Sequence, residues 1–209
     1  MWSRLPSAIS PDPVQLDPET VRELAIAFQP ASYLRVLPHV HRSTPLGMGF
    51  GHTRFSSPTK SFRLVYLAQN LATGIAETIV RDRFEGVRSR VLDETEFEDW
   101  AVTEVSALEP LVVLDLRTVG LLRLGVSTDA ARAKQHDEGR TLSEALYRSF
   151  DVDGLLYASR LTAAPCVAVY DRAVSRKLKA GPVLELLRHP ELIPSLQSIG
   201  VTVRSDHPG

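Results

Sequence analysis

Cysteine pairs, long apolar runs and a surplus of either charge are all missing from this 209-residue sequence. Its one cysteine, Cys166, excludes an intramolecular disulfide framework and a multi-cysteine zinc site. Lys and Arg number 24 against 25 Asp and Glu, so the cationic surplus of a general nucleic-acid binder is absent and no direct nucleic-acid partner is expected. No stretch approaches the ~18 consecutive apolar residues of a membrane span, and the N-terminus lacks the apolar region of a signal peptide. We therefore expect a cytoplasmic protein with no membrane partner.

The common catalytic and cofactor signatures are missing as well. The sequence contains no G-x-G-x-x-G, P-loop, G-x-S-x-G or H-E-x-x-H motif. His39 and His41 would share one face of a strand, but no further ligand follows at a metal-binding spacing, so we predict no metal site. Cys166 lies in an apolar run over 165–169, where a buried structural thiol is a better prediction than a nucleophile.

What is present is an ordinary globular composition, with 44% apolar and 23% charged residues. Residues 1–16 read as an irregular arm, and residues 38–60 read as a long connection. Apolar spacing predicts helices over 17–28, 70–84, 128–135 and 141–150, the last beginning with a capping box at Thr141 and Glu144. Strands are predicted over 33–37, 63–67, 101–107, 111–115, 154–158 and 165–170. Because strands and helices do not alternate regularly, the fold class is α+β.

The organisation that follows is an N-terminal arm and helix over 1–30, a catalytic domain over 31–175, and a C-terminal extension over 176–209 that packs on the same domain. Within the catalytic domain, residues 81–99 segregate their charges, with arginines first and carboxylates after. This pattern is typical of a solvated helix end and loop, and the alternative is an edge that docks a partner.

Five polar residues stand out, each for its place in the predicted elements. Arg35 interrupts an apolar strand, Arg54 lies in the glycine-rich connection, and Tyr66 lies in a strand that leads straight into a helix. Glu77 lies inside that helix beside apolar positions, and Ser159 closes an apolar strand. Each also has a structural interpretation. Arg35 and Glu77 could form a buried ion pair, Tyr66 could belong to the core, and Ser159 could bond the backbone at a strand end. Residue by residue, those interpretations are favoured.

The order of these residues along the chain changes that weighing. The segments Tyr33-Leu34-Arg35-Val36, Thr53-Arg54-Phe55-Ser56, Val65-Tyr66-Leu67-Ala68 with Ala76-Glu77, and Leu156-Tyr157-Ala158-Ser159-Arg160 together resemble the RES-domain family over roughly residues 31–175. The eleven-residue step from Tyr66 to Glu77 is the most specific part. The loop departs from the family, which often has Gly-Arg-Trp-Asn where this chain has residues 53–56, and the stretch between Glu77 and Ser159 is long.

The resemblance implies an ADP-ribosyltransferase-like core with a cleft between two small sheets. It implies a toxin of a bacterial toxin–antitoxin pair that cleaves the nicotinamide–ribose bond of NAD⁺, with water or phosphate as acceptor. NAD⁺ is then a substrate, no cofactor is needed, and the partner is an Xre-like antitoxin in a hetero-oligomer. Glu77, Arg35 and Ser159 carry over as catalytic residues, and Arg35, Arg54, Tyr66 and Ser159 as substrate-binding residues. A mono-ADP-ribosyltransferase acting on a cellular protein and a non-catalytic nucleotide-binding module remain as alternatives.

The chemistry of NAD⁺ suits these residue types. Nicotinamide leaves as a neutral molecule, so no general acid is needed, and the site must instead stabilise a ribosyl cation. The carboxylate of Glu77 can do this electrostatically. The guanidinium of Arg35 or Arg54 suits the pyrophosphate, and Tyr66 can stack on the cationic ring for roughly 0.5–2 kcal/mol. Ser159 can bond the carboxamide or orient Glu77.

Overall fold

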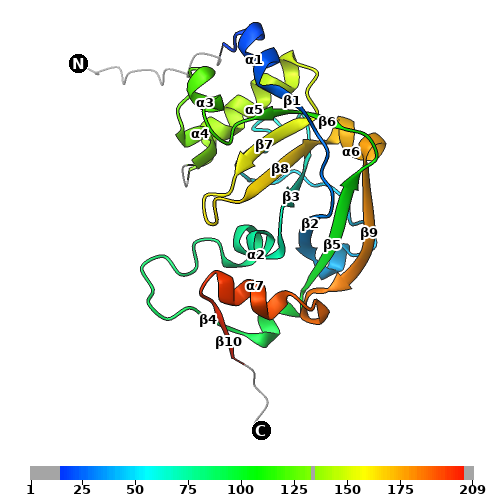
Figure 1. The fold of residues 1–209 in the computed structure, drawn as a ribbon, viewed down its shortest axis with the longest axis vertical. Coiled ribbons are helices and arrows are strands. Elements are labelled where there is room, and N and C mark those ends of the chain that lie inside the picture. The colour runs from blue at the N-terminus through cyan, green and yellow to red at the C-terminus, as the bar shows by residue number, and fades with distance from the viewer. Residues whose placement is uncertain (1–14, 133–134, 205–209) are drawn as a thin grey trace, which may run out of the picture.

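The alternating apolar segments of the sequence form one large curled sheet in the computed structural model, which describes residues 15–132 and 135–204. Eight strands follow the order β1-β6-β7-β8-β3-β2-β5-β9 (Figure 1). They are β1 (Ala25–Phe28), β2 (Tyr33–Pro38), β3 (Leu64–Ala68), β5 (Trp100–Ala107), β6 (Leu111–Asp115), β7 (Gly154–Ala158), β8 (Pro165–Tyr170) and β9 (Leu178–Glu185). Neighbouring strands are antiparallel except β6 and β7, which are parallel. A second sheet pairs β4 (Val91–Asp93) with β10 (Thr202–Arg204).

The large sheet is nearly divided between β2 and β3. Only one residue pair, Leu34 with Ala68, is in register there, whereas β2 and β5 share six pairs and β3 and β8 share five. The strands therefore splay apart into a five-stranded part and a three-stranded part. The α+β class is confirmed, and the two parts of this nearly divided sheet take the place of the two small sheets that were expected.

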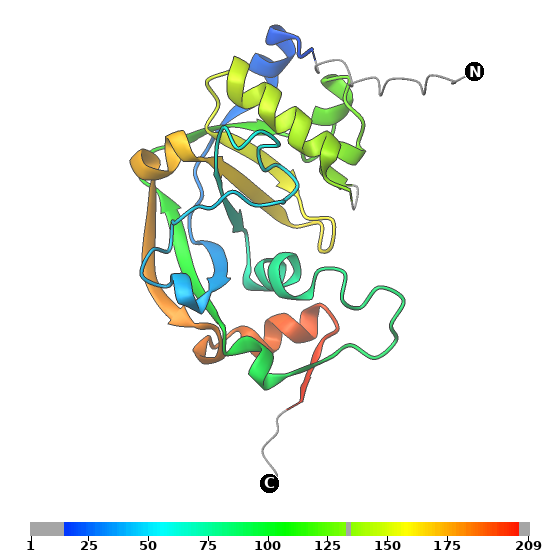
Figure 2. The ribbon, with the colours of Figure 1, turned by 180° about the vertical axis from the view of Figure 1, so that it is seen from behind.

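Helices cover the two parts of the sheet separately (Figures 1 and 2). Apolar residues of α1 (Pro18–Leu24), α3 (Gly120–Arg123), α4 (Asp129–Arg132) and α5 (Asp137–Ser149) pack on one face of β6, β7, β8 and β3. The opposite face packs against α6 (Asp171–Lys177). A third cluster joins β2 and β5 to α2 (Leu71–Ile75), the π-helical turn η2 (Ala76–Val80) and α7 (Leu192–Ser198). Three short 3-10 turns complete the described part of the chain, namely η1 (His39–His41), η3 (Glu94–Phe97) and η4 (Leu186–Arg188). The first and third clusters thus cover one part of the sheet each, whereas the α6 cluster spans both parts, with Tyr33 of β2 and Val105 of β5 beside Val65 of β3.

The predicted helix over 17–28 is only half correct. Asp17 caps α1 by accepting the Thr20 backbone N–H at 2.8 Å, as its position suggested, but the helix ends at Leu24. Residues 25–28 instead form β1, which pairs with residues 111–114 of β6. Helical spacing in that segment was overridden by pairing to a distant strand, which local sequence does not reveal.

Two other predicted helices also differ at their boundaries. The helix that follows Asn70 was expected to run to Phe84, but it ends at Val80, because Arg81 has a φ of 43°. The helix expected over 141–150 begins earlier, at Asp137, so Thr141 and Glu144 do not form a capping box. The helix expected over 128–135 is α4, which ends at Arg132, and residues 133–134 lie outside the described residues.

The first and last elements of the described chain, α1 and β10, lie at opposite extremes of the view in Figure 1. Most of the arm expected over 1–16 lies outside the described residues. The segment expected as a C-terminal extension supplies β9, which pairs with β5 along residues 101–107. In the part of the chain that the structure describes, no helix combines the length and the apolar character needed to cross a membrane.

Candidate functional site

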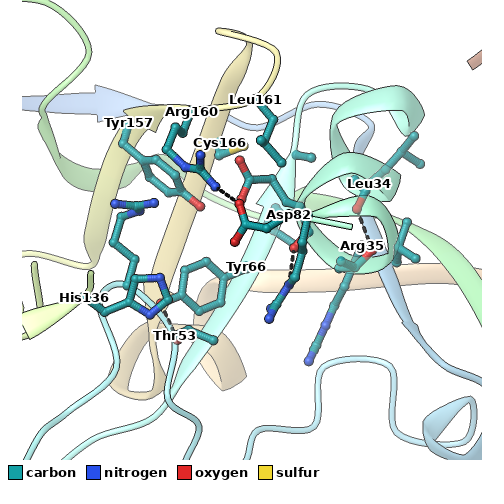
Figure 3. Close-up of a pocket in the computed structure, with 18 residues that line it drawn as sticks. Leu34, Arg35, Thr53, Tyr66, Asp82, His136, Tyr157, Arg160, Leu161 and Cys166 are labelled. Carbon is teal, nitrogen blue, oxygen red and sulfur yellow. Dashed lines mark hydrogen bonds and ion pairs between the residues drawn. The ribbon is translucent and has the colours of Figure 1, made fainter. Parts of the chain in front are cut away.

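A cavity of about 260 Å³ opens where β2 and β3 splay apart. Residues 34–36 of β2 and 66–68 of β3 form two of its walls. In Figure 3, Tyr66, Tyr157 and His136 lie on one side, Leu34 and Arg35 lie on the other, and Asp82 lies between them. The cavity therefore follows directly from the weak joint in the sheet.

The helix after β3 places Glu77 in this cavity. Asn70 caps α2 by accepting the Thr73 backbone N–H at 2.9 Å. From there the helical spacing places the side chains on two faces. Leu71, Ile75 and Ile79 enter the core, and the opposite face lines the cavity with Gly74, Glu77, Thr78 and Arg81. A carboxylate that looked misplaced among apolar neighbours thus belongs to the cavity face.

Close packing of α2 on β2 sets how near the cavity-lining face of the helix lies to the strand. A Cβ atom at Gly74 would lie 3.0 Å from Cγ2 of Val36, so glycine permits the helix to approach the strand. The last turn is π-helical, with the Arg81 N–H donating to the Ala76 carbonyl at 2.7 Å. Such turns are frequent at functional sites.

Ser159 orients the Glu77 carboxylate. Its hydroxyl donates to Oε1 of Glu77 at 2.5 Å and accepts the backbone N–H groups of Leu161 and Thr162 at 3.1 and 3.2 Å. Ser159 is 4% exposed and begins the turn between β7 and β8. Because its lone pairs are taken by the turn, the only proton of the hydroxyl is directed at the carboxylate. Of the two roles predicted for Ser159, this geometry favours orienting Glu77.

The hydroxyl of Tyr66 holds the loop that carries Arg54. It accepts the Phe55 backbone N–H at 3.1 Å and hydrogen-bonds Oγ1 of Thr53 at 2.8 Å. Both neighbours of Arg54 are therefore tied to β3, and Arg54 itself lines the cavity. Burial lowers the pKa of Arg54 while the negative charge of Glu77 opposes that shift, so the two side chains interact electrostatically. Burial also raises the pKa of Tyr66 to about 12, so it is a neutral phenol at physiological pH.

Arg35 lines the same cavity but makes a different set of contacts. Its Nη1 and Nη2 donate to the carbonyls of Pro45 and Gly47 at 2.7 and 2.8 Å, in the connection after β2. Burial lowers its pKa to about 10. In the described part of the chain no ion pair joins Arg35 to Glu77, so the simple ion-pair interpretation fails.

The lining has a surplus of positive charge. Four arginines face two carboxylates among the described lining residues, which are Arg35, Arg54, Arg81 and Arg160 against Glu77 and Asp82. Arg160 pairs with Asp82 across the edge of the cavity (Figure 3). The site is therefore built to receive an anion, with one carboxylate held in place within it.

The structure gathers the predicted residues around one space. Arg35, Arg54, Tyr66 and Glu77 line it, and Ser159 bonds Glu77 from behind. Sequence reasoning missed further lining residues, namely Thr53, Arg81, Asp82, His136, Tyr157 and Arg160. A signal was available for Thr53, Tyr157 and Arg160, which lie in the same short segments as Arg54 and Ser159. Arg81 and Asp82 follow the end of η2, and His136 precedes α5, and no local signature places these three at the cavity.

The cysteine and histidine predictions have separate outcomes. Cys166 is 2% exposed, and burial raises the pKa of its thiol to about 12, which confirms a buried protonated thiol, although it also touches the cavity. His39 and His41 lie in the 3-10 turn η1 and not on one face of a strand. Among residues 15–132 and 135–204, no group of three or more His, Cys, Asp and Glu side chains could hold a metal ion.

The charged segment 81–99 is partly neutralised by one ion pair within it and another to β10. Arg83 pairs with Glu96, and Asp93 pairs with Arg204 of β10. One arginine and one carboxylate that are separated along the sequence thus meet in the fold, and both are partly exposed, which agrees with a solvated segment.

Comparison with known proteins gives consistent matches. Residues 29–189 match the model of the RES domain. "Probable toxin y4kH" of Sinorhizobium fredii (strain NBRC 101917 / NGR234) is 37% identical over 93 residues, which make up 43% of this chain and 73% of that protein. A chain of the M. tuberculosis MbcT–MbcA toxin–antitoxin complex has a TM-score of 0.64 at 18% identity, over 88% of this chain and 100% of that chain. At that identity the structural likeness concerns the fold alone.

Proposed function

The chain belongs to the RES domain family, and from this premise we propose that it is the toxin of a bacterial toxin–antitoxin pair that degrades NAD⁺. The reaction is cleavage of the nicotinamide–ribose bond, with water or phosphate as acceptor. The observation that carries the proposal is the Glu77 carboxylate, fixed by Ser159 inside an arginine-lined cavity.

The charges of the cavity match those of the substrate. NAD⁺ has a pyrophosphate with two negative charges and a nicotinamide ring with one positive charge. The arginines of the lining suit the first, and the second needs an aromatic or anionic neighbour. Tyr66 offers an aromatic ring for the cationic base, worth roughly 0.5–2 kcal/mol.

Glu77 has the role of stabilising the transition state. As the bond to nicotinamide breaks, positive charge passes from the ring to the ribose, and nicotinamide departs neutral. A carboxylate beside the ribose stabilises that charge only while it develops, so the contact acts mainly on kcat. Holding the carboxylate with a buried hydroxyl lets it act without reorganising, and one such oriented contact is worth ~2.7–4 kcal/mol.

Nicotinamide release by the purified chain tests the proposal. We expect turnover of NAD⁺ by the wild type and a loss of roughly a hundredfold or more in Glu77→Ala, with its fold preserved by circular dichroism. Glu104→Gln is the control, because that carboxylate is exposed on β5 away from the cavity. Wild-type turnover in Glu77→Ala would remove Glu77 from the mechanism.

The product identifies the acceptor and decides between the alternatives. Free ADP-ribose indicates water, and ADP-ribose phosphate formed only when phosphate is added indicates phosphorolysis. A mass increase of one ADP-ribose on a cellular protein would favour a mono-ADP-ribosyltransferase. NAD⁺ binding without any product would favour a nucleotide-binding module.

An antitoxin partner is the second part of the proposal. Its support is the fold shared with a chain of a toxin–antitoxin complex, and the expected partner is an Xre-like protein encoded by a neighbouring reading frame. Co-expression should yield a hetero-oligomer with suppressed NAD⁺ turnover. Separate elution of the two proteins on gel filtration would contradict this part.

A further inference from the structure

The loop that brings Arg54 to the cavity is held from its far side by helix α5. Tyr66 fixes the two residues beside Arg54, but the loop continues to residue 61 before β3 begins. Over this stretch the hydrogen bonds to side chains outside the loop come from α5, which packs on β3, β6, β7 and β8 (Figure 2). The placement of Arg54 therefore depends on a helix that carries none of the predicted site residues.

Glu144 is the centre of this attachment. Its Oε2 accepts the Ser57 hydroxyl at 2.6 Å, and its Oε1 accepts those of Thr59 and Ser61 at 2.7 and 2.8 Å. Arg148 adds an ion pair at 2.6 Å. Glu144 is 8% exposed; burial pushes its pKa up, but the three hydroxyl bonds and Arg148 outweigh burial, so the net pKa is lowered and the carboxylate stays charged.

Two further residues of α5 extend the attachment toward Arg54. Arg140 donates from Nε to the Ser56 carbonyl at 3.1 Å and from Nη2 to the Ser57 carbonyl at 3.3 Å. Gly139 lies against Arg54 itself, since a Cβ atom there would be 2.6 Å from the Arg54 carbonyl oxygen. The helix thus contacts the loop backbone from residue 54 to residue 57 and its hydroxyls up to residue 61.

We propose that Gly139, Arg140 and Glu144 are positioning residues that set where Arg54 meets the pyrophosphate of the substrate. They act through the loop and do not line the cavity. The inference rests on the proposed function for the identity of the ligand, whereas the mechanical link from Glu144 to Arg54 stands on the contacts alone. The two are therefore tested by separate measurements.

Hydrogen exchange of the loop amides tests the mechanical link without any substrate. In Glu144→Gln we expect faster exchange at Ser61, whose N–H bonds Ser57 Oγ at 2.9 Å, and also at Phe55 and Ser56 beside Arg54. Glu138→Gln is the matched control, because it is the same change at an exposed position of the same helix. Unchanged exchange at Phe55 and Ser56 would overturn the inference, even if Ser61 responded.

A double-mutant cycle with Arg54 tests whether the link reaches the substrate. Glu144→Gln should raise KM for NAD⁺ by roughly tenfold while kcat stays within about twofold, because Glu77 and Ser159 lie on other elements. In an Arg54→Ala background the same change should add almost nothing. If the double variant raises KM by the product of the two single effects, as two independent structural defects would, the inference is overturned.

A milder variant replaces Glu144→Gln in this experiment if Glu144→Gln folds poorly. Ser61→Ala removes one of the three hydroxyls at an exposed position and should give a smaller rise in KM of the same kind. If the wild type releases no nicotinamide under any condition, the proposed function fails, and the exchange experiment still decides the link between α5 and the Arg54 loop.

Discussion

Replacing Ser159 by alanine separates its effect on Glu77 from its effect on the turn. The hydroxyl makes three bonds, one donated to the carboxylate at 2.5 Å and two accepted from backbone N–H groups. Hydrogen bonds to charged groups contribute about 1.5–3 kcal/mol, which corresponds to a fall in kcat of about 10- to 150-fold. KM should change little, because the carboxylate acts on charge that develops only in the transition state.

The same substitution has a smaller expected effect on stability. The turn loses one acceptor for the N–H groups of Leu161 and Thr162, and Leu161 is 37% exposed, so water can replace part of that bond. We expect the free energy of unfolding to fall by about 1 kcal/mol, measured by urea denaturation. Catalysis and stability should therefore change by clearly different amounts.

Thr162→Val is the control for this experiment. Oγ1 of Thr162 bonds Oγ1 of Thr73 at 2.8 Å, so it joins the same turn to the same helix without touching Glu77. It should cost similar stability and leave kcat within about twofold. The reasoning is refuted if Ser159→Ala keeps wild-type kcat, or if Thr162→Val loses as much activity as Ser159→Ala.

Three further predictions follow from the same contacts. Tyr66→Phe removes the hydroxyl that holds the Arg54 loop and should raise KM for NAD⁺ by roughly tenfold in steady-state assays, with kcat retained. Burial raises the pKa of Tyr66 to about 12 from an ordinary value of 10.0, so above pH 10 the folded state binds more protons than the unfolded state. The free energy of unfolding should therefore fall as the pH rises from 10 to 12. Urea denaturation at each pH should show a shallower fall in Tyr66→Phe. Leu156→Ala empties a fully buried position in the middle of β7 and should lower the free energy of unfolding by about 2–5 kcal/mol in the same assay; a smaller loss would contradict the packing described for that face.

Six of the ten strands in the described residues were predictable because alternation and β-branched residues act locally, whereas β1, β4, β9 and β10 were not predicted. The segments over 33–37, 101–107, 111–115, 154–158 and 165–170 all form strands close to their expected bounds. Helix boundaries were less predictable, because they depend on tertiary contacts. Residues 25–28 keep helical spacing and yet pair with β6, and the helix after Asn70 stops at Arg81, a residue with no sequence feature that announces a positive φ.

The site residues could be named from their order along the chain, but their contacts could not. Thr141 and Glu144 match the pattern of a capping box, a local rule, yet Glu144 binds hydroxyls more than 80 residues away. Ser159 ends an apolar strand, and only the turn that follows shows that its proton points at Glu77. Long-range pairing of this kind has no period or spacing in the sequence.

The two arginines predicted to bind the pyrophosphate differ in what else they hold. Nη1 and Nη2 of Arg35 donate to the carbonyls of Pro45 and Gly47, so moving this guanidinium toward a ligand would break the hydrogen bonds that hold the connection after β2. Arg54 instead has its backbone fixed on both sides by Tyr66 and faces the charge of Glu77 across the cavity. We therefore expect Arg35 to keep the wall of the cavity in shape, and Arg54, which lines the cavity from a backbone held on both sides, to meet the pyrophosphate.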